Sequence, residues 1–572
     1  MIKRMNAYRS RLDTALASLA GGDSIKAEAL FRAILAEAPD CAEAWHGLAC
    51  VARHTGQPRL AIASVAHALT LTQDNVERAR FHLTLAASLD EAGHLREAVS
   101  ACRVATLMEP RDFRAHALMS ELLYRSEQNE AAASAFSMAL SLAADPVPLL
   151  TRHGAFLMEQ RRFAAAMACF RRLVALCPQE AAAHANLGAA CFENGAMEEA
   201  LAALRKAVAL APPSAQTLNN LGLVYQALGY SIPAEEAFDA ALALFPDDCV
   251  LACNRATLLA ETDREKEAET FFRDMIADGG AWSAQARFNL GMIQLGRGEF
   301  AQGWSNFESR QSLIESTVLP PWDGERTEGR VLIEGEQGLG DCLQFLRFVP
   351  DAALRAPLLL RLPEVLDPLL AFMPELQPLL RSGRVVLSGE ATKRCSLLSL
   401  PARLGVTTVD ASPYLDFGLS PEKGRIGIFN AGNPTYRFDA RRSLPRAYFA
   451  PILAVQGVTF VNLQQEQDAA LLEPGVEQGI GHTLVDTARA LARCEMVIGV
   501  DTMMAHLTGA MGRPLWLLDR EGGDWRWKGP DWYTGLRIFR PEGGLPPDEA
   551  WPPVIERVAQ ALRERSGGYD GV

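Results

Sequence analysis

The 572-residue sequence predicts a long solenoid of paired α-helices followed by an α/β region, on two observations. In the first half, a small residue recurs nine times at intervals of 34 to 37 residues. From about residue 330, short apolar runs alternate with helical stretches, which is typical of parallel sheets covered by helices. No run of 18 apolar residues occurs, so we expect no transmembrane segment.

The repeat of the first half is defined by more than its small residue. An aromatic or apolar residue follows four positions later in eight units, and a proline follows twelve positions later in five. A small residue at a fixed place lets two antiparallel helices approach closely, so the period predicts stacked helix pairs. A chance alanine-rich bundle is the alternative, which nine units in phase disfavour. The small residues are Ala27, Ala61, Ala98, Ala132, Ala166, Ala200, Ala234, Ala268 and Gly303.

This pattern resembles the tetratricopeptide repeat (TPR) family, and its cleanest copy is AAAHANLGAACFENGAMEEALAALRKAVALAP at 181–212. The resemblance implies a superhelix whose concave groove binds a partner protein. We therefore expect a TPR array of about nine repeats over residues 1–310, followed by a junction at 311–329.

Charge and cysteine content restrict the remaining classes of function. The net charge of −13 argues against nucleic acid as the main partner. Eleven cysteines are scattered along the chain, and Cys249 and Cys253 have no second pair that would complete a zinc site. We expect reduced thiols, and hence a cytoplasmic protein.

The second half contains two units of alternating strands and helices. We expect one lobe at 330–423 and another at 424–572, which ends in a closing helix. Two such Rossmann-like lobes place a ligand cleft between them, at the carboxyl ends of the strands. The seven candidate strands begin near Arg330, Ala356, Arg384, Arg425, Val458, Glu495 and Arg513.

Two segments combine a strand end with glycine or arginine. In EGEQGLGDCLQFLRF (334–348), Gly338 and Gly340 permit a tight turn before a helix, and Asp341 lies at the start of that helix. The alternative is that Asp341 only caps the helix. In NAGNPTYRFDARRSLP (430–445), three arginines could neutralise a phosphate, unless the loop is simply solvated. These arginines are Arg437, Arg441 and Arg442.

Two later segments add further candidate residues. A strand delivers Asp501 and Thr502 to its carboxyl end, and the helix that follows carries His506. The alternative is a helix cap with a core histidine. Further on, an aromatic loop could stack on a base or a sugar, or could pack the two lobes together. Its aromatic residues are Trp525, Trp527, Trp532 and Tyr533.

Together these segments resemble TPR-fused GT-B glycosyltransferases of the heptosyltransferase-like (glycosyltransferase family 9-like) group. The matching motifs are EQGLGD (336–341), AGNP (431–434) with RSLP (442–445), VDTMMAHL (500–507) and DWRW (524–527). The architecture is also similar to that of O-GlcNAc transferases and bacterial flagellin glycosyltransferases. The resemblance implies that 330–423 is the acceptor lobe and that 424–572 binds the nucleotide-sugar.

The resemblance also implies roles for single residues. Asp341 matches the catalytic base, which would take the proton of an acceptor hydroxyl. No D-x-D motif occurs, which fits a metal-independent inverting enzyme, so we expect no metal or other cofactor. The residues expected around the nucleotide-sugar donor are Gly338, Gly340, Asn433, Arg442, Asp501, Thr502, His506 and Trp525.

The sequence therefore predicts a cytoplasmic glycosyltransferase that moves a sugar from a nucleotide-sugar to a Ser or Thr hydroxyl. The acceptor would be a protein, for example flagellin, that is recruited by the TPR groove. One alternative is a glycosyltransferase that acts on lipopolysaccharide or another glycan. A second is a TPR scaffold with an inactive transferase domain. UDP-, GDP-, ADP- and CMP-sugars all remain open as donors.

Overall fold

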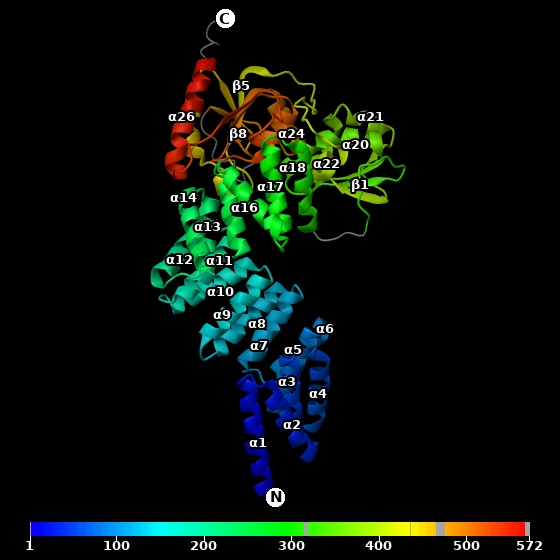
Figure 1. The fold of residues 1–572 in the computed structure, drawn as a ribbon, viewed down its shortest axis with the longest axis vertical. Coiled ribbons are helices and arrows are strands. Elements are labelled where there is room, and N and C mark those ends of the chain that lie inside the picture. Colours follow the sequence, from blue (N-terminus) through cyan, green and yellow to red (C-terminus); the bar gives the residue numbers. More distant parts are fainter. Residues whose placement is uncertain (1, 314–318, 435, 437, 465–474, 567–572) are drawn as a thin grey trace. The chain divides into compact units, whose positions relative to one another are not determined.

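The computed structural model describes residues 2–313, 319–434, 436, 438–464 and 475–566. The chain divides into two compact units, residues 1–194 and 195–572, and each is described by itself. The division falls inside the repeat array, so the later repeats share a unit with the α/β region (Figure 1). The boundaries expected near residues 310 and 423 remain predictions. Among the described residues, no helix has the length and apolar character needed to cross a membrane.

The first unit consists of repeat helices. Where their bounds are described, they run in pairs of about 14 residues joined by short turns. They are α1 (Ile2–Ala20), α2 (Ser24–Glu37), α3 (Ala42–His54), α4 (Pro58–Leu71), α5 (Asn75–Glu91), α6 (Leu95–Met108), α7 (Phe113–Arg125), α8 (Asn129–Leu142), α9 (Pro146–Glu159), α10 (Phe163–Leu176) and α11 (Ala181–Glu193).

The second unit begins with further helices of the same kind and continues into the α/β region. The helices are α12 (Met197–Leu210), α13 (Ala215–Leu228), α14 (Ser231–Leu244), α15 (Cys249–Ala260), α16 (Glu265–Asp278), α17 (Ser283–Gly296) and α18 (Phe300–Phe307). A 3₁₀ turn, η1 (Glu308–Leu313), follows.

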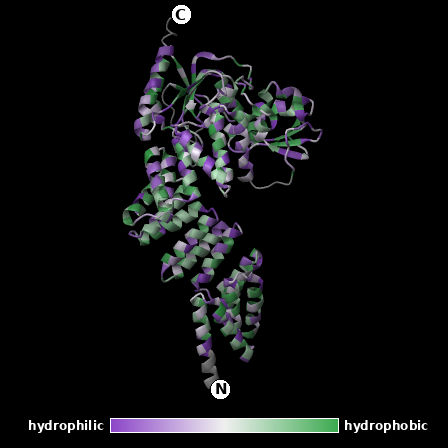
Figure 2. Ribbon diagram, in the orientation of Figure 1, coloured by the Kyte–Doolittle hydropathy of each residue, from purple (hydrophilic) through white to green (hydrophobic). Residues whose placement is uncertain are grey.

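The repeat pattern predicts the packing of these helices correctly. The eight repeat alanines from Ala27 to Ala268 are all fully buried, as expected where paired helices touch. Gly222 in α13 is a second position where the packing needs a small residue. A Cβ there would lie 2.6 Å from the Phe238 ring of α14. In Figure 2 the repeat helices carry hydrophobic and hydrophilic residues side by side, as amphipathic helices do. The predicted TPR solenoid is thus confirmed.

The first lobe is built on a parallel four-stranded sheet in the order β3-β2-β1-β4. Its strands are β1 (Val331–Glu334), β2 (Leu358–Arg361), β3 (Val385–Val386) and β4 (Lys393–Ser396). Its helices are α19 (Leu339–Phe345), η2 (Leu346–Phe348), α20 (Val349–Arg355), η3 (Glu364–Phe372), α21 (Leu376–Arg381), η4 (Leu397–Ser399) and α22 (Leu400–Leu404).

The second lobe is built on a parallel six-stranded sheet in the order β10-β9-β8-β5-β6-β7. Its strands are β5 (Glu422–Phe429), β6 (Thr459–Asn462), β7 (Val476–Gln478), β8 (Cys494–Val500), β9 (Leu515–Leu518) and β10 (Leu536–Phe539). Its helices are η5 (Asp439–Arg441), η6 (Arg446–Phe449), α23 (Ala450–Leu453), α24 (Leu484–Ala492), α25 (Met503–Ala510), η8 (Trp525–Trp527) and α26 (Pro547–Ser566).

All seven candidate strands form, and β4, β7 and β10 were not anticipated. These three are short, with three or four residues each, and mix polar with apolar residues, which gives a weak signal. The helix expected after the turn at Gly338 and Gly340 is divided into α19, η2 and α20. Pro350 lies in the first turn of α20 and has no N–H to continue a helix that arrives from α19.

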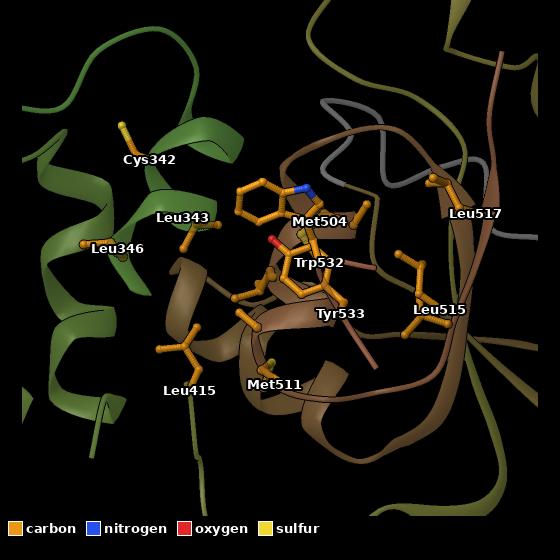
Figure 3. Packing of buried hydrophobic residues seen from close by; sticks show 14 of the residues in the cluster. Cys342, Leu343, Leu346, Leu415, Met504, Met511, Leu515, Leu517, Trp532 and Tyr533 are labelled. Atoms are coloured by element: carbon orange, nitrogen blue, oxygen red, sulfur yellow. The ribbon is translucent and has the colours of Figure 1, made fainter. Parts of the chain in front are cut away.

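One hydrophobic core joins the two lobes and the last repeat. Trp532 and Tyr533 lie between α19, which carries Leu343, and strand β9, which carries Leu515 (Figure 3). On the repeat side, the Trp304 ring meets the Trp525 ring edge to face, with centroids 6.0 Å apart. The relative placement of both lobes and of α18 therefore depends on a shared aromatic cluster.

Candidate active site

A cavity of about 1160 Å³, called the main cavity below, lies within the second unit. It is lined by the loop between β1 and α19, by the loops after β5, β8 and β9, and by the repeat helices α13, α15 and α17. The carboxyl ends of parallel strands are the usual place for a ligand in such sheets. All nine predicted site residues line it: Gly338, Gly340, Asp341, Asn433, Arg442, Asp501, Thr502, His506 and Trp525.

The first lobe contributes Asp341 through the turn that starts α19. Gly338, and not Asp341, is the residue that caps this helix. Asp341 lies at the third helical position, and its Oδ2 accepts a hydrogen bond from the Gly338 N–H at 3.0 Å. Asp341 therefore lies near the N-cap and stabilises the helix start, as the capping alternative expects, so capping and a role in the cavity are both compatible with its position. Gln337 just before has a φ of 60°, a strained value that is found often at functional turns.

The other carboxylate oxygen of Asp341 contacts Arg526 of the second lobe. Arg526 also donates to the Gln344 side chain at 2.8 Å and to Asp524 at 2.8 Å. Burial opposes the charge of Arg526, but the carboxylates of Asp341 and Asp524 outweigh burial and raise its pKa. Arg526 thus ties the two lobes together directly at the candidate base. Arg526 lies in the DWRW motif, but the family resemblance implies no role for it.

Gly340 brings α19 against α25. A Cβ at Gly340 would lie 2.8 Å from His506 Cδ2 and 3.3 Å from Met503 Cα. The beginnings of the two helices, one from each lobe, therefore touch at the wall of the main cavity, and a Cβ at Gly340 would force a neighbouring group to shift.

His506 is buried and neutral. Its Nδ1 lies 3.0 Å from the Tyr533 hydroxyl, and its ring stacks on Trp527 with centroids 5.1 Å apart. Burial, reinforced by the positive charge of Arg526, lowers its pKa to about 3. His506 is therefore neutral near pH 7, so it can hydrogen-bond to a ligand but does not supply positive charge.

Asp501 and Thr502 follow β8 directly. Thr502 is the N-cap of α25, and its hydroxyl accepts from the Met504 N–H at 3.3 Å. Burial, followed by the nearby carboxylates of Asp524 and Asp519, raises the pKa of Asp501 to about 7. Asp501 is consequently partly protonated near neutral pH, and its carboxyl group can then donate a hydrogen bond.

The loop after β5 carries two of the predicted arginines to the cavity wall. Arg442 Nε donates to Asp439 Oδ1 at 2.9 Å, and its guanidinium lies 4.9 Å from the Tyr436 ring centre. Arg441 pairs with Glu261 of the repeat array at 2.9 Å. The third arginine, Arg437, lies outside the described residues.

The aromatic loop packs the interior. Trp525, Trp527, Trp532 and Tyr533 are each at most 6% exposed. Of the two interpretations offered by the sequence, packing therefore describes these rings, and Trp525 adds only part of its surface to the cavity wall. Among the described residues, no group of three or more His, Cys, Asp or Glu side chains is arranged to hold a metal ion.

The repeats supply one wall of the main cavity, which the sequence pattern did not predict. Four side-chain amides of α13, α15 and α17, called the amide face below, line the cavity beside apolar residues such as Phe288 and Met292. Asn254 and Asn289 occupy equivalent repeat positions, 35 residues apart. This recurrence of an amide on the same helix face is a sequence signal for the amide face. The amide face consists of Gln226, Asn254, Gln285 and Asn289.

Comparisons with known proteins agree with the repeat assignment. One tetratricopeptide repeat profile matches residues 12–76 and 156–215, and another matches residues 215–248. Protein FlbA of Caulobacter vibrioides is 28% identical over 393 residues, which cover 57% of this chain and 63% of that protein. The match thus spans less than two thirds of the relative's length.

Two solved structures are also similar to part of the chain. A tetratricopeptide repeat protein from Parabacteroides merdae is 17% identical and covers 44% of this chain and 98% of that one, with a TM-score of 0.32. MamA from Desulfovibrio magneticus is 22% identical and covers 30% of this chain and 97% of that one, with a TM-score of 0.26. From the profile matches and the helix pairs, the chain is a TPR-containing protein with a C-terminal α/β region.

Proposed function

We propose that the protein is a metal-independent, inverting glycosyltransferase that moves a sugar from a nucleotide-sugar to a protein hydroxyl. The observation that carries the proposal is the main cavity. A carboxylate of the first lobe and the cation-bearing loops of the second lobe converge there, at the carboxyl ends of two parallel sheets. That arrangement suits a base on one side and a nucleotide-sugar on the other.

The chemistry follows from the residue types. Asp341 would accept the proton of the acceptor hydroxyl as the new glycosidic bond forms. The bond from the sugar to the nucleotide phosphate breaks, and the phosphate leaves with added negative charge. Arg442 lines the second-lobe side of the cavity and can stabilise that charge. The transition state would be oxocarbenium-like.

The amide face supports a polypeptide as the acceptor. Asn254 donates to Asn219 at 2.8 Å, and Asn289 donates to Thr257 at 3.1 Å, so these groups form an ordered row along three repeats. Side-chain amides both donate and accept, and so match the alternating groups of an extended peptide backbone. A Ser or Thr hydroxyl carried by such a segment would enter the same cavity as Asp341. Flagellin remains one candidate acceptor.

The test is Asp341→Asn in the full-length enzyme. Activity would be read as release of UDP, GDP, ADP or CMP from a panel of nucleotide-sugars, and as the mass gain of a co-purified partner protein. Asn keeps the shape of the side chain but cannot take the proton, so turnover should fall by ~10²–10⁴-fold. Nucleotide binding should be retained. The melting temperature should fall modestly, by the equivalent of about 1–3 kcal/mol, because Arg526 loses one of two carboxylates.

The matched control is Asp351→Asn, which changes an exposed aspartate in α20 of the same lobe. It should leave turnover unchanged. Near-normal transfer by a folded Asp341→Asn enzyme would remove Asp341 as the base. Glu336 is then a poor substitute, because its carboxylate is already bound by Arg310 and Ser396. Absence of activity in the wild type with every donor would favour a scaffold with an inactive transferase domain.

A further inference from the structure

We propose that Glu261, which belongs to the repeat array, positions the adjacent arginines Arg441 and Arg442 for the nucleotide-sugar donor. This inference rests on the proposed function. It makes a repeat residue part of the donor side of the site, although the sequence assigned that side to the second lobe alone.

The contacts of Glu261 come from three separate segments. Its Oε2 accepts from Arg441 Nη1 at 2.9 Å and from Gln226 Nε2 of α13 at 2.6 Å. Its Oε1 lies 3.8 Å from Arg520 Nη2, in the loop after β9. One carboxylate therefore holds two arginines from two loops of the second lobe, and a neighbouring repeat helix orients that carboxylate.

The backbone of Glu261 makes a further contact with the second lobe. Gly522 lies so close that an added Cβ would be 1.7 Å from the Glu261 carbonyl oxygen. Gly522 also has a φ of 67°, which favours glycine. The loop after β9 is thus packed onto the end of α15, and the side-chain pairs form where the backbones already meet.

The balance of charge gives this cluster its rigidity. The Arg441 side chain is only 11% exposed. Burial opposes ionisation of Glu261, but Arg441 and Arg520 outweigh it and lower the pKa of its carboxyl group. Without Glu261, two neighbouring arginines would be left facing each other with little solvent, which strongly favours rearrangement. Arg442 is next in the chain and lines the main cavity. Holding Arg441 in place therefore also restrains the backbone that carries Arg442 to the cavity wall.

The repeat fold itself does not require this glutamate. Glu159 occupies the equivalent place in an earlier repeat, seven residues before Ala166, just as Glu261 lies seven before Ala268. Glu159 is exposed on α9. A glutamate at this phase is therefore compatible with a solvated helix end, and Glu159→Gln provides a matched control for Glu261→Gln.

The first measurement needs no ligand. Hydrogen exchange would be followed in the full-length protein for the backbone amides of residues 438–444. Glu261→Gln should speed their exchange by about tenfold, as expected for loss of a charge-assisted hydrogen bond. Glu159→Gln should leave it unchanged, and the amides of β8 should not change in either variant. Unchanged exchange at 438–444 in Glu261→Gln would overturn the proposal.

The second measurement ties the contact to the donor. UDP, GDP, ADP and CMP would be titrated calorimetrically into the wild type, Glu261→Gln, Arg441→Gln and the double variant. The nucleotide that binds the wild type should bind each single variant about tenfold more weakly, and the losses should not add in the double variant. Additive losses, or full affinity in Glu261→Gln, would overturn the positioning role. If no nucleotide binds the wild type, the proposed function and its donor side fail, while the exchange result still decides whether Glu261 orders the loop.

Discussion

At the scale of single residues, the main cavity holds carboxyl groups in opposite electrostatic settings. Asp341 faces Arg526, whereas Asp501 lies near Asp519 and Asp524 and has a pKa raised to about 7. One carboxyl group is therefore held beside a cation, and the other favours its protonated form. In the proposed reaction the two would have different tasks, acceptance of a proton by Asp341 and hydrogen bonding to a ligand by Asp501.

Asp501→Asn should stabilise the protein in a pH-dependent way. The folded state binds a proton at Asp501 up to about pH 7, whereas the unfolded chain releases it near pH 4, so wild-type stability falls as pH rises between these values. Asn carries no titrating proton at this position, so its free energy of unfolding does not fall in this way. The variant's free energy of unfolding should exceed that of the wild type by ~1–3 kcal/mol at pH 8 and by almost nothing at pH 4. Melting temperatures across this range would check it. A difference that does not depend on pH would contradict the raised pKa.

Arg442→Ala should raise KM for the nucleotide-sugar and lower kcat. The side chain lines the second-lobe wall and is held by Asp439 and Tyr436. In the proposed reaction its loss would remove a positive charge that stabilises the leaving phosphate. We expect a fall in kcat/KM of ~10²-fold. Arg446→Ala, in η6 of the same lobe and away from the cavity lining, serves as the control. Equal effects of the two substitutions would argue against a local role for Arg442.

At the scale of elements, the two lobes meet where α19 and α25 begin. Gly340 makes this approach possible, and the Gly338 N–H is already occupied by Asp341. Any side chain at Gly340 would separate the two helix starts and change the distance between Asp341 and the loops of the second lobe.

Gly340→Ala should therefore lower activity more than stability. The methyl group would lie 2.8 Å from the His506 ring, and that ring is fixed between Trp527 and Tyr533. We expect a loss of about 1–3 kcal/mol in unfolding free energy, typical of overpacking, with at least a tenfold loss of turnover. Denaturant unfolding and turnover would be measured together. Gly383→Ala is the control for activity, because its φ of 71° makes alanine costly for stability, while its Cβ would meet nothing within 4 Å and the residue does not line the cavity.

The elements also show how far sequence reasoning reaches. The repeat phase and the seven apolar strands were readable because burial imposes a period on each of them. All nine predicted site residues line one cavity because each lies in a loop or helix start that follows the carboxyl end of a predicted strand. Arg526 and Glu261 could not be assigned, since their partners are distant in sequence. Glu159 has the same repeat position as Glu261 and a different environment, so only the tertiary structure separates them.

At the scale of the molecule, the second compact unit includes repeats as well as the α/β region. Three cations of the second lobe depend on repeat carboxylates, since Arg441 and Arg520 face Glu261, and Lys528 binds Glu265 at 2.8 Å. Trp304 adds a hydrophobic contact to the same interface. The folding unit of the candidate transferase therefore begins before the α/β region does.

A fragment of residues 195–572 should fold cooperatively, whereas a fragment of residues 319–572 should not. The shorter fragment loses Trp304 and both repeat glutamates, which exposes aromatic surface and leaves buried cations unpaired. Size-exclusion chromatography and near-ultraviolet circular dichroism would distinguish a packed monomer from an aggregate. A monomeric 319–572 fragment with native aromatic signals would show that the repeats are dispensable for folding.

Because α13, α15 and α17 supply a wall of the cavity, the repeats cannot all be exchanged for foreign repeats without changing the cavity. A chimera that replaces the repeats up to residue 310 would discard part of the cavity itself, together with the counter-charge of Arg441. Foreign repeats should instead be joined near residue 194, where the compact unit begins. Recombination that changes the repeats is then compatible with an intact cavity only when the crossover lies on the amino-terminal side of α12. The later repeats would be inherited together with the α/β region.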